Sequence, residues 1–246
     1  MRFTMAALGS IPWVGSIIGA VASLSGEMEQ DETNQLLVLW LKEHEGKIRN
    51  LQITLEEIFL RFDSFGEDVQ KRIESEEYLN LVRRTFRSWD QADTEDKRQM
   101  YKRLLTNAGA TTLCPDDLVR LFIGWIDVYH EAHFVVIREI YQHPGITRGT
   151  IWDNVHGAEV RPRDNSSQAG LFGYLIRELT LGGVIHQQTE VNAYGQAIKK
   201  SRPKSNGGGS STKKSHFDDV EPYELTELGK EFVHYVMKDV ALQIES

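Results

Sequence analysis

Cysteine is nearly absent from this sequence, which has Cys114 as its single cysteine in 246 residues. One thiol cannot form an intramolecular disulfide, so we expect the protein to work in a reducing compartment. The segment that follows, Pro115-Asp116-Asp117, is typical of a helix start, because proline and acidic residues both favour the first turn. No activating partner lies near Cys114 in the sequence, which argues against a catalytic thiol.

Motifs of catalysis are also missing. The sequence has no phosphate-binding glycine loop, no nucleophile motif and no metal-ligand spacing. His130 and His133 bracket Glu131, but the zinc-protease motif needs its histidines at i and i+4, and here they lie at i and i+3. We therefore expect a surface or interface histidine pair, in a protein that is not an enzyme and uses no cofactor and no metal.

Basic residues are also fewer than acidic residues. The chain has 28 Lys and Arg against 36 Asp and Glu, a net charge of −8. This excess of carboxylates argues against a protein that coats nucleic acid non-specifically. Hydrophobic residues make up 40% and charged residues 26%, which is typical of a globular chain rather than a disordered one.

Charge of either sign is absent from residues 3–26, between Arg2 and Glu27. A helix of that length spans about 36 Å, against a bilayer core of about 30 Å. Three interpretations compete: a secretory signal peptide with Ala20-Val21-Ala22 as its cleavage site, a buried core helix, and a membrane-inserting or pore-lining segment. We favour the membrane segment and place it at residues 1–26.

Small residues in this stretch support the membrane interpretation. Gly15 and Gly19 form a GxxxG pair, which lets helices approach closely inside lipid. Pro12 predicts a kink, and Trp13 suits the headgroup level of a bilayer. The expected membrane or pore residues are Ile11, Pro12, Trp13, Gly15, Ile18 and Gly19.

Residues 27–129 predict a helical oligomerisation domain. Apolar residues alternate at spacings of four and three, which is the heptad period of supercoiled helices. Either an intramolecular bundle or an intermolecular coiled coil explains this seam. Further helices are expected over 67–89, from 93 or 94 to a stop at Asn107-Ala108-Gly109, and from Pro115 to Tyr129, with no strand before about residue 180. The seam residues are Leu37, Leu41, His44, Ile48, Leu51, Leu55, Ile58 and Phe62.

Residues 130–246 change pattern. Three helices are expected, ending near His143, Val155 and Leu179, the second and third starting at Thr147 and Ser166. Strands over 184–189 and 223–226 and a final helix over 227–244 follow. The stretches LIRELTLGGVIHQ and YELTELGKEFV resemble those of winged helix-turn-helix domains. The fold class is therefore mainly α: a membrane helix, a helical bundle or coiled-coil domain, and a C-terminal winged-helix (α+β) domain.

A long wing is expected at residues 190–222, and its middle is basic and rich in glycine and serine. It is either a disordered, solvated loop or an arm that grips a phosphate backbone. Only Arg177 lies within the expected recognition helix, which favours single strands over a specific duplex site. The expected nucleic-acid-binding residues are Arg148, Arg161, Arg163, Arg177, Lys199, Lys200, Arg202, Lys204, Lys213 and Lys214.

The stretch Ile11-Pro12-Trp13-Val14-Gly15 is similar to an I-P-x-V/I-G-like pattern in the glycine-rich heads of small membrane effectors of bacterial antiphage systems. The chain resembles most the channel-forming effectors of Hailong-type systems. This resemblance implies an antiviral defence effector in the bacterial inner membrane, with cytoplasmic soluble domains and contacts to membrane lipid. It implies a homo-oligomer, with a tetramer as the working candidate. Such channels are held closed by single-stranded DNA oligomers from a partner nucleotidyltransferase, and open when that DNA is lost.

Two other functions fit the same sequence. The first is a winged-helix DNA-binding transcriptional regulator, in which the apolar head serves as a dimerisation helix. The second is a scaffold whose winged helix binds protein.

Overall fold

The computed structural model describes residues 46, 49–50, 53–54, 57–58, 67–110, 114–158, 161–188 and 215–238. The expected membrane segment, most of the heptad seam and the six basic residues of the wing lie outside them. The chain divides into two compact units. We call residues up to Val128 together with Tyr235 onward the first unit, and Tyr129 to His234 the second unit.

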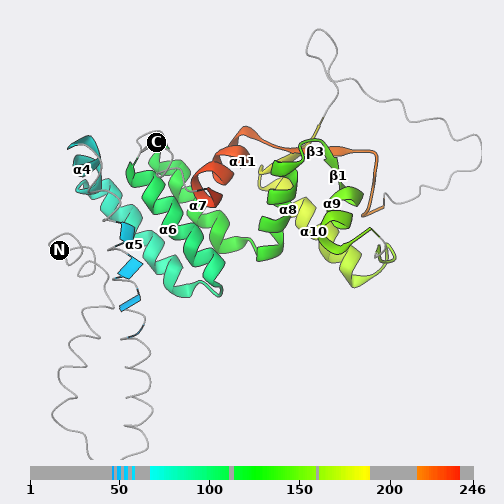
Figure 1. The fold of residues 1–246 in the computed structure, drawn as a ribbon, viewed down its shortest axis with the longest axis horizontal. Coiled ribbons are helices and arrows are strands. Elements are labelled where there is room, and N and C mark those ends of the chain that lie inside the picture. Colours follow the sequence, from blue (N-terminus) through cyan, green and yellow to red (C-terminus); the bar gives the residue numbers. More distant parts are fainter. Residues whose placement is uncertain are drawn as a thin grey trace, which may run out of the picture. The chain divides into compact units, whose positions relative to one another are not determined.

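The first unit is helical over its described residues. Helices α5, α6 and α7 pack against one another in pairs, as Figure 1 shows, and α4 contacts α5 and α6. Their apolar faces meet in a core that includes Tyr78, Leu81, Phe86, Leu104 and Phe122. The helices are α4 (Glu67–Ile73), α5 (Glu76–Gln91), α6 (Glu95–Ala110) and α7 (Asp116–Val128).

The single helix expected over 67–89 is wrong, because the chain breaks between α4 and α5. Ser75 explains the break. Its backbone is extended and its hydroxyl accepts a hydrogen bond from the Tyr78 backbone N–H, which is the geometry of a helix N-cap. A new helix therefore starts at this cap, although the helical spacing of apolar residues over 67–89 shows no interruption there.

The stop expected at Asn107-Ala108-Gly109 is also wrong, because α6 continues to Ala110. All three residues are buried, and Asn107 is fully enclosed. Its side-chain amide donates to the Tyr235 carbonyl at 2.8 Å and to the Lys238 carbonyl at 3.2 Å. These bonds attach the end of the described chain to α6. The residues before that end form a π-helical turn, η1 (Val233–Met237).

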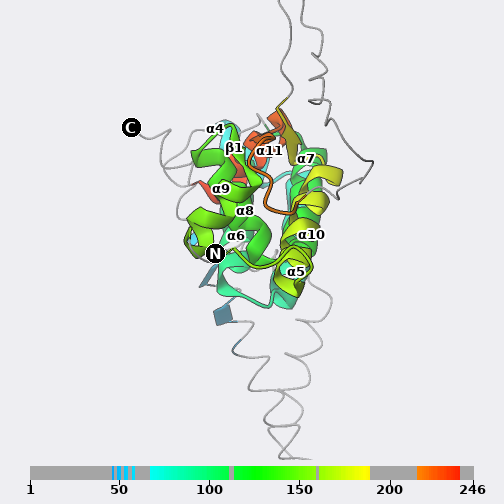
Figure 2. The same cartoon turned by 90° about the vertical axis from the view of Figure 1, so that its right-hand side faces the viewer.

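The second unit combines helices with one small sheet. Helix α8 packs against both α9 and α10 and lies between them in Figure 2. Strand β3 pairs antiparallel with β1 on one side and β2 on the other, giving the order β1-β3-β2. The elements are α8 (Glu131–Gln142), β1 (Ile146–Thr147), α9 (Arg148–His156), α10 (Ser167–Leu181), β2 (Ile185–Gln187), β3 (Pro222–Leu225) and α11 (Glu227–Phe232).

Most local expectations for this unit are confirmed. Thr147 and Ser166 cap α9 and α10 through their hydroxyls, and the two expected strands pair, with Ile185 opposite Leu225. Strand β1 contradicts the expectation of no strand before about residue 180. It has two residues, too few to produce an alternating pattern, and forms because Ile146 pairs with Tyr223. The mainly-α class is confirmed over the described residues.

No helix in the described ranges has both the length and the hydropathy of a transmembrane span. The segment for which a membrane helix is expected, residues 1–26, lies outside those ranges.

Replacing Asn107 with Ala should lower the free energy of unfolding by about 2–3 kcal/mol, because two carbonyls lose their donor in a buried environment. Chemical denaturation measures this change. Thr106→Ala is the matched control, since Thr106 is equally buried but its hydroxyl bonds within its own helix, to the Lys102 carbonyl. We expect the control to cost about 1 kcal/mol. Equal losses in the two variants would contradict the role assigned to Asn107.

Candidate nucleic-acid interface

The four arginines expected to bind nucleic acid have different surroundings. Arg148 donates through Nε to the Tyr223 hydroxyl at 2.7 Å, and its guanidinium lies 5.1 Å from the centre of that ring. Arg177 lies over the ring of Tyr174, at 5.6 Å from its centre. Arg163 is exposed in the loop between α9 and α10. Arg161, in the same loop, is bound by two carboxylates. The other expected ligands, Lys199 to Lys214, lie outside the described residues.

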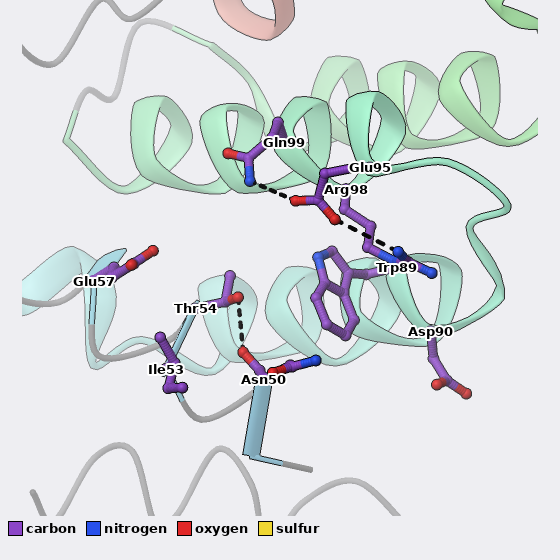
Figure 3. Close-up of a pocket in the computed structure, with 9 residues that line it drawn as sticks. All are labelled: Asn50, Ile53, Thr54, Glu57, Trp89, Asp90, Glu95, Arg98 and Gln99. Carbon is purple, nitrogen blue, oxygen red and sulfur yellow. Dashed lines mark hydrogen bonds and ion pairs between the residues drawn. The ribbon is translucent and has the colours of Figure 1, made fainter. Parts of the chain in front are cut away.

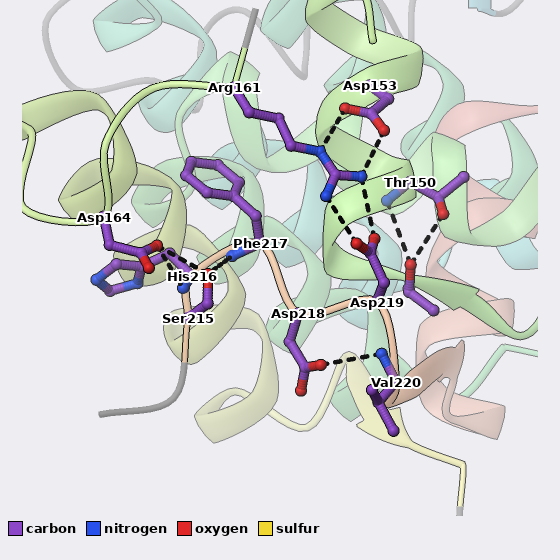
Figure 4. Close-up of polar contacts among 11 residues, drawn as sticks. Thr150, Asp153, Arg161, Asp164, Ser215, His216, Phe217, Asp218, Asp219 and Val220 are labelled. Atoms are coloured by element: carbon purple, nitrogen blue, oxygen red, sulfur yellow. Dashed lines mark hydrogen bonds and ion pairs between the residues drawn. The ribbon is translucent and has the colours of Figure 1, made fainter. Parts of the chain in front are cut away.

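Arg161 makes two forked ion pairs, drawn in Figure 4. Its Nε and Nη2 donate to the two oxygens of Asp153 at 2.8 and 2.6 Å. Its Nη1 and Nη2 donate to Asp219 at 2.7 and 3.0 Å. These bonds lower the pKa of Asp153 and raise the pKa of Arg161. We call this group the Arg161 clamp. With two carboxylates on one guanidinium, it fits a structural tie better than a phosphate ligand.

Gly149, at the start of α9, leaves the space that the clamp needs. A Cβ atom at this position would lie 1.9 Å from Asp219 Oδ1 and 2.7 Å from the Arg161 guanidinium. The Gly149 backbone N–H also donates to the Asp218 carbonyl at 3.2 Å. The segment before β3 can therefore lie directly on the start of α9.

That segment, Ser215 to Val220, is the C-terminal root of the basic wing, and we call it the insert root. Asp164 Oδ1 accepts from the Ser215 hydroxyl at 2.8 Å and from the His216 backbone N–H at 3.1 Å (Figure 4). Phe217 is buried against Trp152 and Phe172, with ring centres 5.0 and 5.9 Å apart. The insert root is thus fixed to the second unit by hydrogen bonds, ion pairs and aromatic packing.

The insert root also lies on α10. A Cβ atom at Gly173 would be 2.2 Å from His216 Nδ1, so the missing side chain lets the imidazole sit against the helix. The exposed face of α10 beside it is mostly uncharged. Leu171 is 57% exposed, Tyr174 40% and Leu181 77%, and Arg177 is the exposed basic residue of this helix.

Carboxylates outnumber basic side chains among the described residues of the second unit. A concentrated set of positive charges lies instead in the sequence between β2 and the insert root. That stretch holds Lys199, Lys200, Arg202, Lys204, Lys213 and Lys214 and, from 199 to 216, no acidic residue. Lys213 and Lys214 directly precede Ser215.

The first unit has a separate pocket of about 380 Å³, shown in Figure 3. Its polar groups bond to their neighbours: Glu95 accepts from Gln99 at 2.8 Å and from Arg98 at 3.5 Å. The Arg98 guanidinium lies 5.7 Å from the centre of the Trp89 ring. Within the part of the chain that the structure describes, no cluster of His, Cys, Asp or Glu could hold a metal ion. The pocket is lined by Asn50, Ile53, Thr54, Glu57, Trp89, Asp90, Glu95, Arg98 and Gln99.

Comparison with models of known families, with curated proteins and with solved structures found no match.

Sequence analysis did not find the groups that hold the insert root. Asp153, Asp164 and Asp219 lie in three separate polar segments, and no spacing rule links them. Tyr174 could have been noticed, because it stands three residues before Arg177 and so shares a helical face with it.

The Arg161 clamp predicts a specific dependence of stability on pH. A carboxyl whose pKa is lowered in the folded state contributes stability above its unfolded pKa, about 3.9, and loses it as the pH falls through the lowered value. Arg161→Met should therefore destabilise the protein near neutral pH, and its difference from the wild type should shrink below about pH 4. Urea unfolding at a series of pH values measures this. Arg163→Met, in the same loop, is the control. A wild-type-to-variant difference that stays constant with pH would contradict the assignment.

Proposed function

We propose that the second unit is a winged-helix-type module that binds single-stranded nucleic acid through the basic stretch 199–214, with Arg177 of α10 as a further cation. The element order α8-β1-α9-α10-β2-β3 and the sheet order β1-β3-β2 support the winged-helix assignment. The observation that carries the proposal is the fixed insert root. The insert root lies on α10 at Gly173, and the last of the six cations, Lys214, directly precedes it in the sequence.

Single strands fit this arrangement better than a specific duplex site. Reading base edges in a major groove normally uses several arginine, lysine, asparagine or glutamine side chains on the recognition helix. The exposed part of α10 offers mostly Leu171, Tyr174 and Leu181, with Arg177 as its basic residue. The combination of an exposed aromatic ring with concentrated positive charge is instead typical of single-strand binding.

We further propose that this module controls the membrane activity of the N-terminal segment, as in an antiphage defence effector. The support is in the sequence: residues 3–26 carry no charge and contain the Gly15 and Gly19 pair. In this proposal several copies form a channel in the bacterial inner membrane, with the folded units in the cytoplasm. A nucleotidyltransferase partner supplies the oligonucleotide that binds the second unit.

The second candidate function is a DNA-binding transcriptional regulator. The winged-helix element order favours it equally, because many such modules bind duplexes. Tight binding to a palindromic duplex, with weak binding to single strands, would support the transcriptional regulator over the single-strand-binding module.

Replacing the six cations at 199, 200, 202, 204, 213 and 214 with Ser should weaken oligonucleotide binding and flatten its salt dependence. Each phosphate contact contributes about 0.7 to the slope of log affinity against log salt for single strands. Fluorescence anisotropy of a labelled oligothymidylate across a salt series measures both quantities. Arg84→Ser with Arg87→Ser, two exposed positions on α5 of the first unit, is the control. An unchanged slope in the six-site variant would remove this stretch from the site.

Charging the N-terminal segment should abolish its membrane activity. We expect Gly15→Glu and Ile18→Lys to prevent the depolarisation and growth arrest that expression of the wild type causes, because a charge in the bilayer core is costly. Ile18→Leu, which keeps the volume and the polarity, should remain active. Membrane fractionation of the full chain beside a variant lacking residues 1–26 gives the companion measurement. Full toxicity of the charged variants would exclude the pore.

A further inference from the structure

A series of rings runs from the interior of the second unit to the surface of α10. Tyr129 and His133 are both buried, and their rings stack with centres 5.0 Å apart. His133 then meets Tyr174 edge-on, at 6.5 Å and 70°. Tyr174 is 40% exposed, so it is the member of the series that reaches solvent.

The inner rings of this series are held firmly. The His130 backbone N–H donates to His133 Nδ1 at 3.1 Å, which fixes the imidazole at the start of α8. A Cβ atom at Gly182 would lie 2.1 Å from the Tyr129 hydroxyl, so that ring occupies space left by the glycine. Burial, with a smaller contribution from Glu178, raises the pKa of Tyr129 to about 12, and the ring stays neutral at physiological pH. The expectation is a surface or interface histidine pair, and its surface alternative is wrong for His133, because the imidazole is buried in this packed series.

The Tyr174 ring therefore packs against buried rings on one side, and a cation lies beside it. The Arg177 guanidinium lies 5.6 Å from the centre of the Tyr174 ring. An exposed ring of this kind can stack on any unpaired base, at about 1–3 kcal/mol per base, while the cation is available to a phosphate. Bases within a duplex are stacked on one another and cannot use such a ring without being extruded.

Tyr174 is close in the chain to the contact between α10 and the insert root. Its neighbour in α10, Gly173, is the residue against which His216 of the insert root packs. In the sequence, Lys213 and Lys214 directly precede the insert root.

We infer that Tyr174 is a base-stacking residue of the second unit and that Arg177 assists it, so that the site selects unpaired bases over duplex. This inference rests on the proposed function, since it concerns the same ligand. It adds the residue that discriminates between single and double strands, which phosphate contacts alone cannot do.

The test compares Tyr174→Ala, Tyr174→Phe and Leu171→Ala in the full-length protein. Leu171 is the matched control because it is an exposed side chain on the same helix. The probe is a fluorescein-labelled oligothymidylate of about 12 nucleotides, a length within the usual site sizes of single-strand binders. We expect Tyr174→Ala to weaken binding about 10-fold, equivalent to one stacked base. Tyr174→Phe and Leu171→Ala should stay within about twofold of the wild type.

The salt dependence gives a second, independent readout. Stacking involves no phosphate, so the slope of log affinity against log salt should be the same for Tyr174→Ala and the wild type. A 5-iodouracil-substituted oligonucleotide should also crosslink to Tyr174 on irradiation, as identified by mass spectrometry of the tryptic peptides.

Three results would overturn the inference while leaving the proposed function intact: wild-type affinity in Tyr174→Ala, an equal loss in Leu171→Ala, or an equal loss of duplex and single-strand affinity. Failure of the wild type to bind any oligonucleotide would instead contradict the proposed function, and the inference with it. Comparing wild-type binding first separates the two cases.

Discussion

One guanidinium shared by two carboxylates holds the insert root on the second unit. Arg161 joins Asp153 of α9 to Asp219 of the insert root through four hydrogen bonds. Such forked pairs fix direction as well as distance. In the sequence, the stretch 199–214 directly precedes this root, which the clamp and Asp164 hold in place.

The same segment continues into the centre of the sheet. Strand β3 lies between β1 and β2, and α11 follows it after a cap in which Thr226 accepts from the Gly229 backbone N–H at 2.9 Å. Gly229 approaches the Val184 carbonyl so closely that a Cβ atom would be 2.2 Å away. Within the π-turn, the Tyr235 carbonyl accepts from the Asn107 amide, and both residues belong to the first unit. The insert root thus begins a continuous, well-packed path through the second unit.

Local signals in the sequence predicted most of the helices and strands, but they did not predict the contacts that hold the insert root. Thr147 and Ser166 act within their own helices, so their sequence context identified them, and the pairing around Ile185 followed from the apolar pattern. Strand β1 and the continuation of α6 past Asn107 depend on partners 77 and 128 residues away, which no local pattern contains. Arg161 shows the same limit: its basic charge predicted a phosphate ligand, while the fold supplies two carboxylates that occupy it.

The most direct test of this account is the affinity of a single-stranded oligonucleotide for a variant with both Asp164→Ala and Asp219→Ala. Removing two negative charges should by itself strengthen binding to an anionic strand. If the fixed insert root positions the cations, the variant will nevertheless bind more weakly than the wild type, because its insert root must be ordered on binding. Equal or tighter binding by the double variant would contradict the central claim.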